Sequence, residues 1–385
     1  MPADSQTLRR SFLASALALP AARLGISGSP GSEAETVNGL PARVLGKTGL
    51  KVTTLGFGCA WTSDSSVFTR GLDAGINYFD TAPNYQGGNA ETMLRAGIGN
   101  HRKQIVLSTK TEAGSKAGAL EQLENSFRAL GTDYIDIWYL HGKDSPGGIK
   151  DDLVEAQVLA KKQGKVRFIG VSTHRLARVT PAILNLGVMD VVLAGYNFTM
   201  DAAVGEAADE LHKAGIGLVD MKAMAGGKSI PRWGDQASVP RAFERPGVPS
   251  ASLRWVLKNS LFASALVGML SMEEVEENTE SVRKPFTDAD QKVLAARLDL
   301  IRPVYCRMCG ACDGQCPKGL PVSDVIRFAM YAESYGQFPA AREHFQQLPD
   351  AVRAVRCDDC SFCAIRCPNG VGVRQRLTLA QDWLA

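Results

Sequence analysis

From residue 40 onward the chain alternates short apolar runs with segments of helical periodicity. The apolar runs are rich in β-branched and aromatic residues, as is typical of buried strands. They are Thr53–Gly58, Asn77–Asp80, Gln104–Thr109, Tyr134–His141, Val166–Val171, Val188–Tyr196, Gly217–Met221 and Ala263–Gly268. Eight strand–helix units in about 240 residues predict an α/β fold, a (β/α)8 TIM barrel over residues 40–285.

The segments between these runs have the spacing of amphipathic helices. In one of them Leu120, Leu123, Phe127 and Leu130 fall on a single helical face. Others are Glu155–Lys162, Ala202–Lys213, Ser250–Asn259 and Met272–Val282. A doubly wound open sheet would show the same alternation, but no G-x-G-x-x-G follows the first strand, which weakens that alternative.

Three consecutive predicted strands end in or beside ionisable residues. The second ends at Asp80 and is followed by Tyr85, the third ends beside Lys110, and the fourth ends at His141. Because the carboxyl ends of barrel strands form one rim, where barrel enzymes hold their catalytic groups, we expect these four side chains to lie together.

The motifs F-D-T-A-x-x-Y and S-T-K, followed by the strand-four histidine, resemble those of the aldo-keto reductases over roughly residues 40–285. The opening segment, Arg43–Val52, resembles the hairpin that closes the barrel bottom in that family. The resemblance implies that Asp80, Tyr85, Lys110 and His141 form a catalytic tetrad acting on a small carbonyl or alcohol substrate.

These residue types suit carbonyl reduction, which needs a proton on oxygen. A tyrosine with a pKa near ~10 is a weak acid at neutral pH, and a nearby ammonium lowers that pKa. We expect Lys110 to act on Tyr85 in this way, Asp80 to keep Lys110 charged, and His141 to orient the substrate oxygen. Tyr85 would then be the general acid and base.

The family resemblance also implies a nicotinamide dinucleotide, NAD(P)H, at the barrel mouth. The residues predicted to contact it are Ser172, Lys222, Gly268, Ser271, Glu277 and Asn278. Ser271 precedes a predicted helix, whose first N–H groups suit a phosphate. Glu277 and Asn278 are expected at the adenine.

Several positions depart from the family pattern. His174 and Leu193 stand near or at positions where an amide side chain is usual, and Glu274 replaces the basic residue for a 2′-phosphate. A carboxylate there would repel that phosphate, so NADH and NADPH both stay open. The insertion at 228–248 contains Lys228, Arg232, Trp233, Arg241 and Arg245, and is either a cover over the active site or a variable surface loop.

Of the nine cysteines, Cys59 stands alone and eight follow residue 305. Those eight form two runs of the bacterial ferredoxin spacing C-x2-C-x2-C-x3-C-P. With the fourth cysteine of each run binding the other cluster, one [4Fe–4S] cluster is expected on Cys306, Cys309, Cys312 and Cys367, and the other on Cys357, Cys360, Cys363 and Cys316. Zinc also uses C-x2-C pairs, but it would leave the x3-Cys-Pro ends unexplained.

The cysteines define a further domain. A helix over Thr287–Ile301, opened by Thr287 and Asp290, is predicted within a connecting segment at 286–302. Residues 303–385 then form a small helical ferredoxin-like domain with two [4Fe–4S] clusters. A barrel followed by such a tail resembles an iron–sulfur branch of the aldo-keto reductase superfamily.

Residues 1–36 are expected to be a signal and linker. Arg9-Arg10-Ser11-Phe12-Leu13 before a short apolar stretch resembles a twin-arginine export signal. We therefore expect a periplasmic protein, with the cytoplasm as the alternative. The net charge of +3 gives no argument for nucleic acid, and no apolar run is long enough for a membrane span.

Two functions stay open at this level. The chain is a carbonyl/alcohol oxidoreductase whose clusters are structural or serve an external electron-transfer partner. Alternatively, it is an exported redox scaffold or electron-transfer protein whose barrel no longer binds nucleotide.

Overall fold

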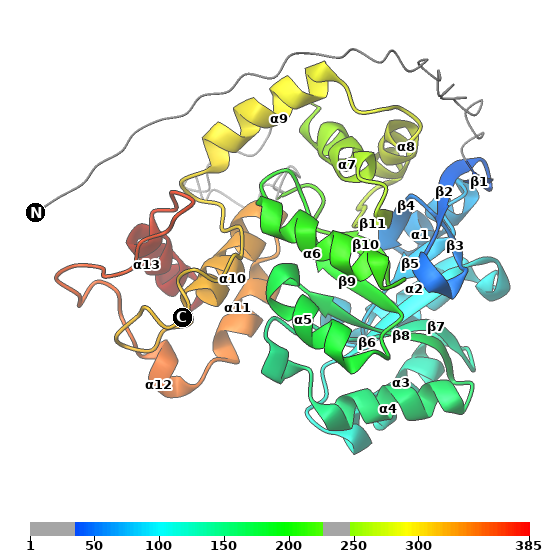
Figure 1. Cartoon of the computed structure of the whole chain (residues 1–385), viewed down its shortest axis with the longest axis horizontal. Helices are drawn as coiled ribbons and strands as arrows, with labels where there is room; N and C mark the ends of the chain where they lie inside the picture. The colour runs from blue at the N-terminus through cyan, green and yellow to red at the C-terminus, as the bar shows by residue number, and fades with distance from the viewer. Residues whose placement is uncertain (1–34, 226–246) are drawn as a thin grey trace, which may run out of the picture. The chain divides into compact units, whose positions relative to one another are not determined.

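Eight parallel strands close into a barrel, as the alternation predicted (Figure 1). The computed structural model describes residues 35–225 and 247–385, so the predicted signal and most of the 228–248 insertion lie outside the described residues. In barrel order the strands are β4 (Leu55–Gly58), β5 (Tyr78–Asp80), β6 (Val106–Thr111), β7 (Ile135–Leu140), β8 (Val166–Thr173), β9 (Val191–Gly195), β10 (Gly217–Met221) and β11 (Phe262–Val267). Parallel pairing of β11 with β4 completes the ring.

Helices surround the barrel (Figure 1), and their apolar side chains pack in a common core with those of the strands. They are α1 (Ser65–Asp73), α2 (Ala90–Ile98), α3 (Lys116–Leu130), α4 (Asp151–Lys162), α5 (Leu176–Leu186), α6 (Ala202–Lys213), α7 (Val248–Lys258) and α8 (Met272–Ser281). In α3 the predicted apolar face is confirmed, since Leu123 and Leu130 are buried in the core and Leu120 and Phe127 pack against it, partly buried. Ser115 caps α3 through Gly118 N–H, and left-handed Gly131 ends it.

A hairpin of β2 (Leu40–Val44) and β3 (Lys51–Thr53) lies at the amino-terminal end of the barrel, as the Arg43–Val52 segment predicted. Its Leu45 and Leu50 pack on inward-facing barrel residues such as Val106 and Val219. The short strand β1 (Thr36–Val37) pairs with β2, so Thr36 belongs to the sheet and not to the predicted linker.

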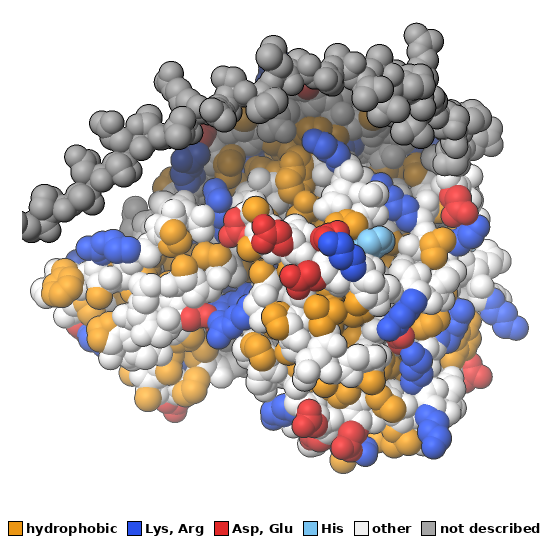
Figure 2. Space-filling model, viewed as in Figure 1, with side chains coloured by type: hydrophobic (Ala, Val, Ile, Leu, Met, Phe, Trp, Pro, Cys, Tyr) orange, Lys and Arg blue, Asp and Glu red, His pale blue; other side chains and the backbone are white. Residues whose placement is uncertain are grey.

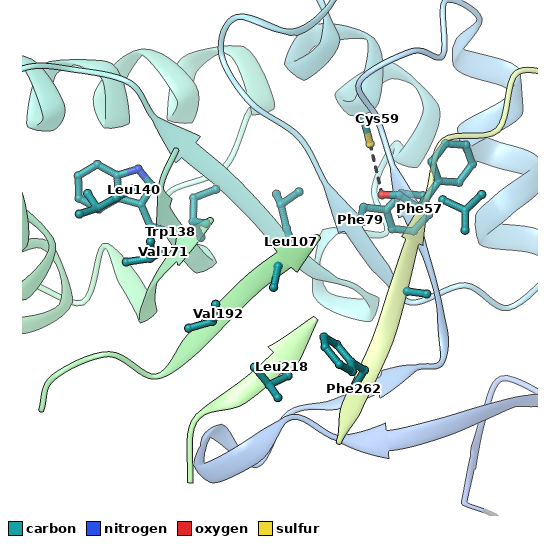
Figure 3. Close-up of a cluster of buried hydrophobic side chains, with 14 of the residues drawn as sticks. Phe57, Cys59, Phe79, Leu107, Trp138, Leu140, Val171, Val192, Leu218 and Phe262 are labelled. Carbon is teal, nitrogen blue, oxygen red and sulfur yellow. Dashed lines mark hydrogen bonds between the residues drawn. The ribbon is translucent and has the colours of Figure 1, made fainter. Parts of the chain in front are cut away.

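Apolar side chains between strands and helices form the main core (Figure 3). Phe57 and Phe79 stack at 5.6 Å between ring centroids, and Trp138 is fully buried. Cys59 is also fully buried, with its Sγ 3.8 Å from the carbonyl oxygen of Phe57. This ninth cysteine therefore packs as a core residue, apart from the cysteine runs.

The chain then enters α9 (Asp288–Ile301), where Thr287 and Asp290 form the predicted capping box. The carboxyl-terminal domain follows, with α10 (Val322–Tyr335), α11 (Phe338–Gln346), α12 (Asp350–Arg353) and α13 (Val373–Leu384). It has a core of its own, in which six of the cysteine side chains pack beside residues of α10 and α13. Arg376 and Glu333 form a buried ion pair between these two helices.

The surface carries both signs of charge. Figure 2 shows acidic and basic side chains interspersed over the face in view, in keeping with the net charge of +3. Within the described residues, no helix has the length and apolar character needed to cross a bilayer.

Candidate active site

The structure brings the four predicted tetrad residues to one rim. Asp80 ends β5, Lys110 lies on β6, His141 follows β7, and Tyr85 begins a 3-10 turn (Tyr85–Gly88) after β5. Lys110 Nζ lies 2.5 Å from Asp80 Oδ2 and 2.7 Å from the carbonyl oxygen of Thr81. It also lies 4.7 Å from the centre of the Tyr85 ring, so one buried ammonium contacts both the carboxylate and the phenol.

The pKa of Tyr85 differs from the value expected from the sequence. Burial alone would lower the pKa of Lys110, but the charges of Asp80 and Tyr85 raise it above its ordinary value. Burial raises the pKa of Tyr85 to about 12, although Lys110 opposes this. Lys110 therefore does lower the pKa of Tyr85 as expected, but burial outweighs it, and the phenol is neutral at pH 7.

His141 has a partner that the sequence reasoning missed. Its Nδ1 lies 2.8 Å from Glu112 Oε1, and its ring meets the Tyr85 ring edge-to-face at 5.7 Å. Burial lowers the pKa of His141, against the effect of Glu112, so the ring is neutral at pH 7. Glu112 lies two residues after Lys110 just beyond β6, and side chains two apart on a strand share a face; that spacing was the available signal.

Two of the predicted cofactor residues are already engaged by the chain itself. Ser172 is buried, and its Oγ accepts a hydrogen bond from Gly142 N–H at 2.8 Å. Lys222 follows β10 with a φ of +67°, an unusual conformation for a residue with a side chain. Its Nζ lies 4.7 Å from the ring centre of Tyr331 and 5.1 Å from that of Tyr335, both on α10.

The other four predicted cofactor residues lie at and after the end of β11. A Cβ on Gly268 would come within 3.2 Å of Trp61, so the backbone there is closely approached. Ser271 caps α8 by accepting Glu274 N–H, while Glu274 Oε2 accepts Leu270 N–H at 2.8 Å. The carboxylate of Glu274 thus holds a backbone donor of the turn that was predicted to receive phosphate.

Further along α8, the remaining two residues face different surroundings. Glu277 is exposed and accepts a hydrogen bond from Ser250 Oγ at 3.2 Å. Asn278 is buried and donates to the Glu274 carbonyl oxygen at 2.8 Å. Among the described residues its own Oδ1 is buried without a hydrogen-bond donor.

The rim also binds the carboxyl-terminal domain through an ion network that the sequence did not predict. His174 Nδ1 lies 3.0 Å from Asp144 Oδ2 and 3.2 Å from Arg327 Nη1 of α10. Burial lowers the pKa of His174 to about 4, against the pull of Asp144 and with the help of Arg327. Beside this network lies a cleft of about 600 Å³, lined by both domains and including Lys143, Arg175 and Asp144.

Neighbouring thiols act on one another electrostatically in the carboxyl-terminal domain. Burial raises the pKa of Cys306 to about 12, with further contributions from the thiolates of Cys312, Cys309 and Cys367. Burial likewise raises the pKa of Cys357 to about 11, with contributions from Cys316, Cys360 and Cys363. In addition, Asn369 Nδ2 donates to Cys309 Sγ at 3.4 Å, which ties the second run to the first.

Eight thiols in two groups of four are the donor set of two cubane clusters. No group of three or more His, Cys, Asp or Glu residues in the described ranges has the geometry to hold a metal ion as it stands. The assignment of the eight cysteines therefore rests on their spacing and on the comparison that follows.

Comparisons with known proteins agree with both halves of this description. Residues 66–242 match the Aldo/keto reductase family, and residues 305–371 match the 4Fe-4S dicluster domain. L-galactose dehydrogenase of Arabidopsis thaliana is 29% identical over 308 residues, which cover 68% of this chain and 94% of that protein. The NADH-specific methylglyoxal reductase of Escherichia coli K12 is 24% identical over 306 residues, covering 65% of this chain and 94% of its own length.

A solved structure gives the same result. The holo form of an aldo-keto reductase from Bacillus halodurans is 26% identical and superposes with a TM-score of 0.56, covering 66% of this chain and 95% of that one. The chain therefore contains an aldo/keto reductase domain followed by a carboxyl-terminal 4Fe–4S dicluster domain, and its similarity to aldo-keto reductases supports an oxidoreductase.

Proposed function

We propose that this protein interconverts a small carbonyl compound and its alcohol, with Tyr85 as the general acid and base. The observation that carries the proposal is the placement of Lys110 between Asp80 and Tyr85. A phenol beside a buried ammonium can give its proton to a carbonyl oxygen, because the phenolate that remains is stabilised by the charge.

Asp80 keeps Lys110 in place. Ser108 Oγ donates to Asp80 Oδ1 at 2.6 Å, while Asp80 Oδ2 receives Lys110. The carboxylate is therefore held on both oxygens, and the ammonium is held by Asp80 and by the carbonyl of Thr81. This arrangement fixes the charge close to the place where a negative charge develops on Tyr85.

His141 orients the substrate oxygen. In the tautomer that carries its proton on Nε2, the neutral ring donates a hydrogen bond to a carbonyl oxygen. The pair of Tyr85 and His141 thereby holds one oxygen of the substrate from two sides. Glu112 lies 2.8 Å from Nδ1 and acts on the substrate only through His141.

We propose further that a nicotinamide dinucleotide supplies the hydride. The unpartnered Oδ1 of Asn278 and the closely approached backbone at Gly268 favour a bound group at this end of the mouth. Asn278, Glu277 and Ser271 would hold the adenosine part, and Lys222 would lie towards the reacting end. The carboxylate of Glu274 on the turn favours NADH over NADPH, because it would repel a 2′-phosphate.

We also propose that two [4Fe–4S] clusters lie in the carboxyl-terminal domain, each bound by three cysteines of one run and the fourth of the other. The clusters either stabilise the domain or pass electrons to an external partner protein. Iron and sulfide analysis of anaerobically purified protein should give about eight irons per chain. A content near four would contradict the two-cluster assignment.

Tyr85 provides the direct test of the reaction. Tyr85→Phe should lower kcat for aldehyde reduction by about a hundredfold or more, the usual contribution of a positioned general acid. Tyr134→Phe is a matched control, since Tyr134 also lies beside a cation (Arg102, 4.0 Å from its ring centre) but precedes β7 at the other end of the barrel. Unchanged kinetics in Tyr85→Phe would remove Tyr85 from the mechanism.

The second candidate function, a redox scaffold without nucleotide, is favoured by one observation. Ser172 and Lys222 already have partners within the chain. Titration of the intact protein with NADH and NADPH, followed by the change in nicotinamide fluorescence, separates the two functions. If neither nucleotide binds and none is released on denaturation, the scaffold function replaces the reductase.

We propose that the protein is exported through the twin-arginine pathway. The supporting feature is Arg9-Arg10 directly before an apolar stretch. Residues 1–36 fused to a reporter that is active only in the periplasm should deliver it there. Changing both arginines to lysine should block delivery, and unaffected delivery would refute the proposal.

A further inference from the structure

The polar face of α10 lies on the mouth of the barrel. Arg327, Tyr331 and Tyr335 are spaced four residues apart on this helix and therefore share one face. Tyr331 is only 6% exposed, and its ring centre lies 6.3 Å from that of Trp61, which follows β4. The carboxyl-terminal domain thus places a tyrosine beside the segment that follows β4, next to the strand that ends at Asp80.

Tyr331 repeats the geometry of Tyr85. Lys110 Nζ lies 4.7 Å from the ring centre of the half-buried Tyr85. Lys222 Nζ lies at the same distance, 4.7 Å, from the ring centre of the buried Tyr331. Tyr331 has a second cation as well, because Arg327 Nη1 donates to its hydroxyl at 3.4 Å. The site therefore contains two phenol–cation pairs, one from each domain.

The two phenols lie close enough to influence each other. A negative charge on Tyr331 contributes to raising the pKa of Tyr85. Burial would raise the pKa of Tyr331 itself, but Lys222 and Arg327 outweigh burial and lower it. At neutral pH the hydroxyl of Tyr331 is accordingly a stronger hydrogen-bond donor than that of an ordinary tyrosine.

A purely structural role explains only part of this arrangement. Tyr335 also contacts Lys222, at 5.1 Å, and Arg327 contacts His174, so these contacts already hold α10 on the barrel. What distinguishes Tyr331 is its hydroxyl, which has its own guanidinium donor and an electrostatic link to Tyr85. A polar group polarised in this way at the edge of a catalytic centre suits a second oxygen of the substrate.

We propose that the active site is shared between the two domains, and that Tyr331 binds a hydroxyl group next to the carbonyl of the substrate. The inference rests on the proposed carbonyl reduction, in which Tyr85 and His141 hold the carbonyl oxygen. The preferred substrates are then hydroxy-aldehydes and hydroxy-ketones. Simple aldehydes leave the Tyr331 hydroxyl without a substrate partner inside a buried site, which lowers their transition-state binding.

The test compares two aldehydes that differ by one hydroxyl, glycolaldehyde and acetaldehyde, with the intact cluster-loaded protein and NADH. The wild type should prefer glycolaldehyde in kcat/KM by about tenfold or more, as expected for one hydrogen bond to a polarised group. Tyr331→Phe should bring the ratio of kcat/KM for glycolaldehyde to kcat/KM for acetaldehyde close to one. Tyr335→Phe, one turn away on the same helix, should keep the preference.

Each other result overturns the inference in a distinguishable way. If Tyr331→Phe reduces both aldehydes with an unchanged ratio, Tyr331 is not a substrate-binding residue although the proposed function stands. If glyoxylate is preferred over glycolaldehyde, the second group is a carboxylate and the proposed substrate class is wrong. If the wild type reduces none of these compounds, the inference falls together with the proposed carbonyl reduction.

Discussion

Replacing Lys110 by methionine tests two roles of its ammonium, in catalysis and in the stability of the fold. The ammonium lies 4.7 Å from the Tyr85 ring centre. With an effective dielectric constant of about 20, its attraction to a phenolate at that distance is about 3.5 kcal/mol. Losing that stabilisation should slow a step that leaves Tyr85 negatively charged by a few hundredfold, since about 1.4 kcal/mol corresponds to a factor of ten.

The same substitution should also destabilise the fold. Asp80 is 4% exposed, and without Lys110 its buried carboxylate keeps, among the described residues, the Ser108 hydroxyl as its side-chain hydrogen-bond partner. Removing one partner of a buried ion pair costs about 3–5 kcal/mol. In the double variant Asp80→Asn with Lys110→Met neither charge is left, so most of the stability should return while kcat stays low.

Two measurements decide the outcome. Chemical unfolding gives the free energy of unfolding of the wild type, Lys110→Met and the double variant, and steady-state kinetics at saturating aldehyde gives kcat for the same three proteins. The reasoning is refuted if folded Lys110→Met keeps kcat within about tenfold of the wild type, because the Coulomb attraction to the phenolate would then be far weaker than calculated.

Three other predictions concern separate parts of the molecule. Burial lowers the pKa of His174 to about 4, so the unfolded chain takes up a proton at a higher pH than the folded protein does. The melting temperature should therefore fall as pH decreases from about 6.5 towards 4. His174→Gln should make the melting temperature less dependent on pH in this range. Arg376→Met leaves Glu333 buried without its ion-pair partner and should lower the free energy of unfolding by about 3–5 kcal/mol. The double variant Arg376→Met with Glu333→Leu should recover most of this loss. If Arg376→Met is as stable as the wild type, the ion pair does not contribute to stability. Replacing Glu274 by glutamine should narrow the preference for NADH over NADPH measured as a ratio of dissociation constants, whereas an unchanged ratio would show that this carboxylate does not face the 2′ position.

Sequence periodicity was sufficient for the barrel. All eight predicted strands are present, and β10 has the predicted ends, Gly217–Met221. The strand order alone also predicted that Asp80, Lys110 and His141 would meet at one rim, because parallel strands in a barrel end on the same side. These features depend on local patterns and on a fold whose topology fixes where strand ends lie.

Other features depend on balances or contacts that no local pattern encodes. The net pKa of Tyr85 is set by burial against the charge of Lys110, and the sequence shows the charge but not the burial. The pairing of His141 with Glu112 was signalled by two-residue spacing, yet the pairing of Asp144 with Arg327 joins positions in different domains. Only tertiary structure reveals the latter.

The face of α10 shows why dividing the chain into an enzyme and a cluster-binding tail is incomplete. One side of the helix packs in the same core as Cys306, Cys312 and four of the other predicted cluster ligands. The same helix also brings Tyr331, a member of that core, to Lys222 and Trp61 of the barrel, and Arg327 to His174. Since one rigid helix touches both, a change in cluster ligation that shifts the core would also shift the Tyr331 hydroxyl. The clusters can therefore affect the reaction through the position of α10, even where no electron passes between them and the barrel.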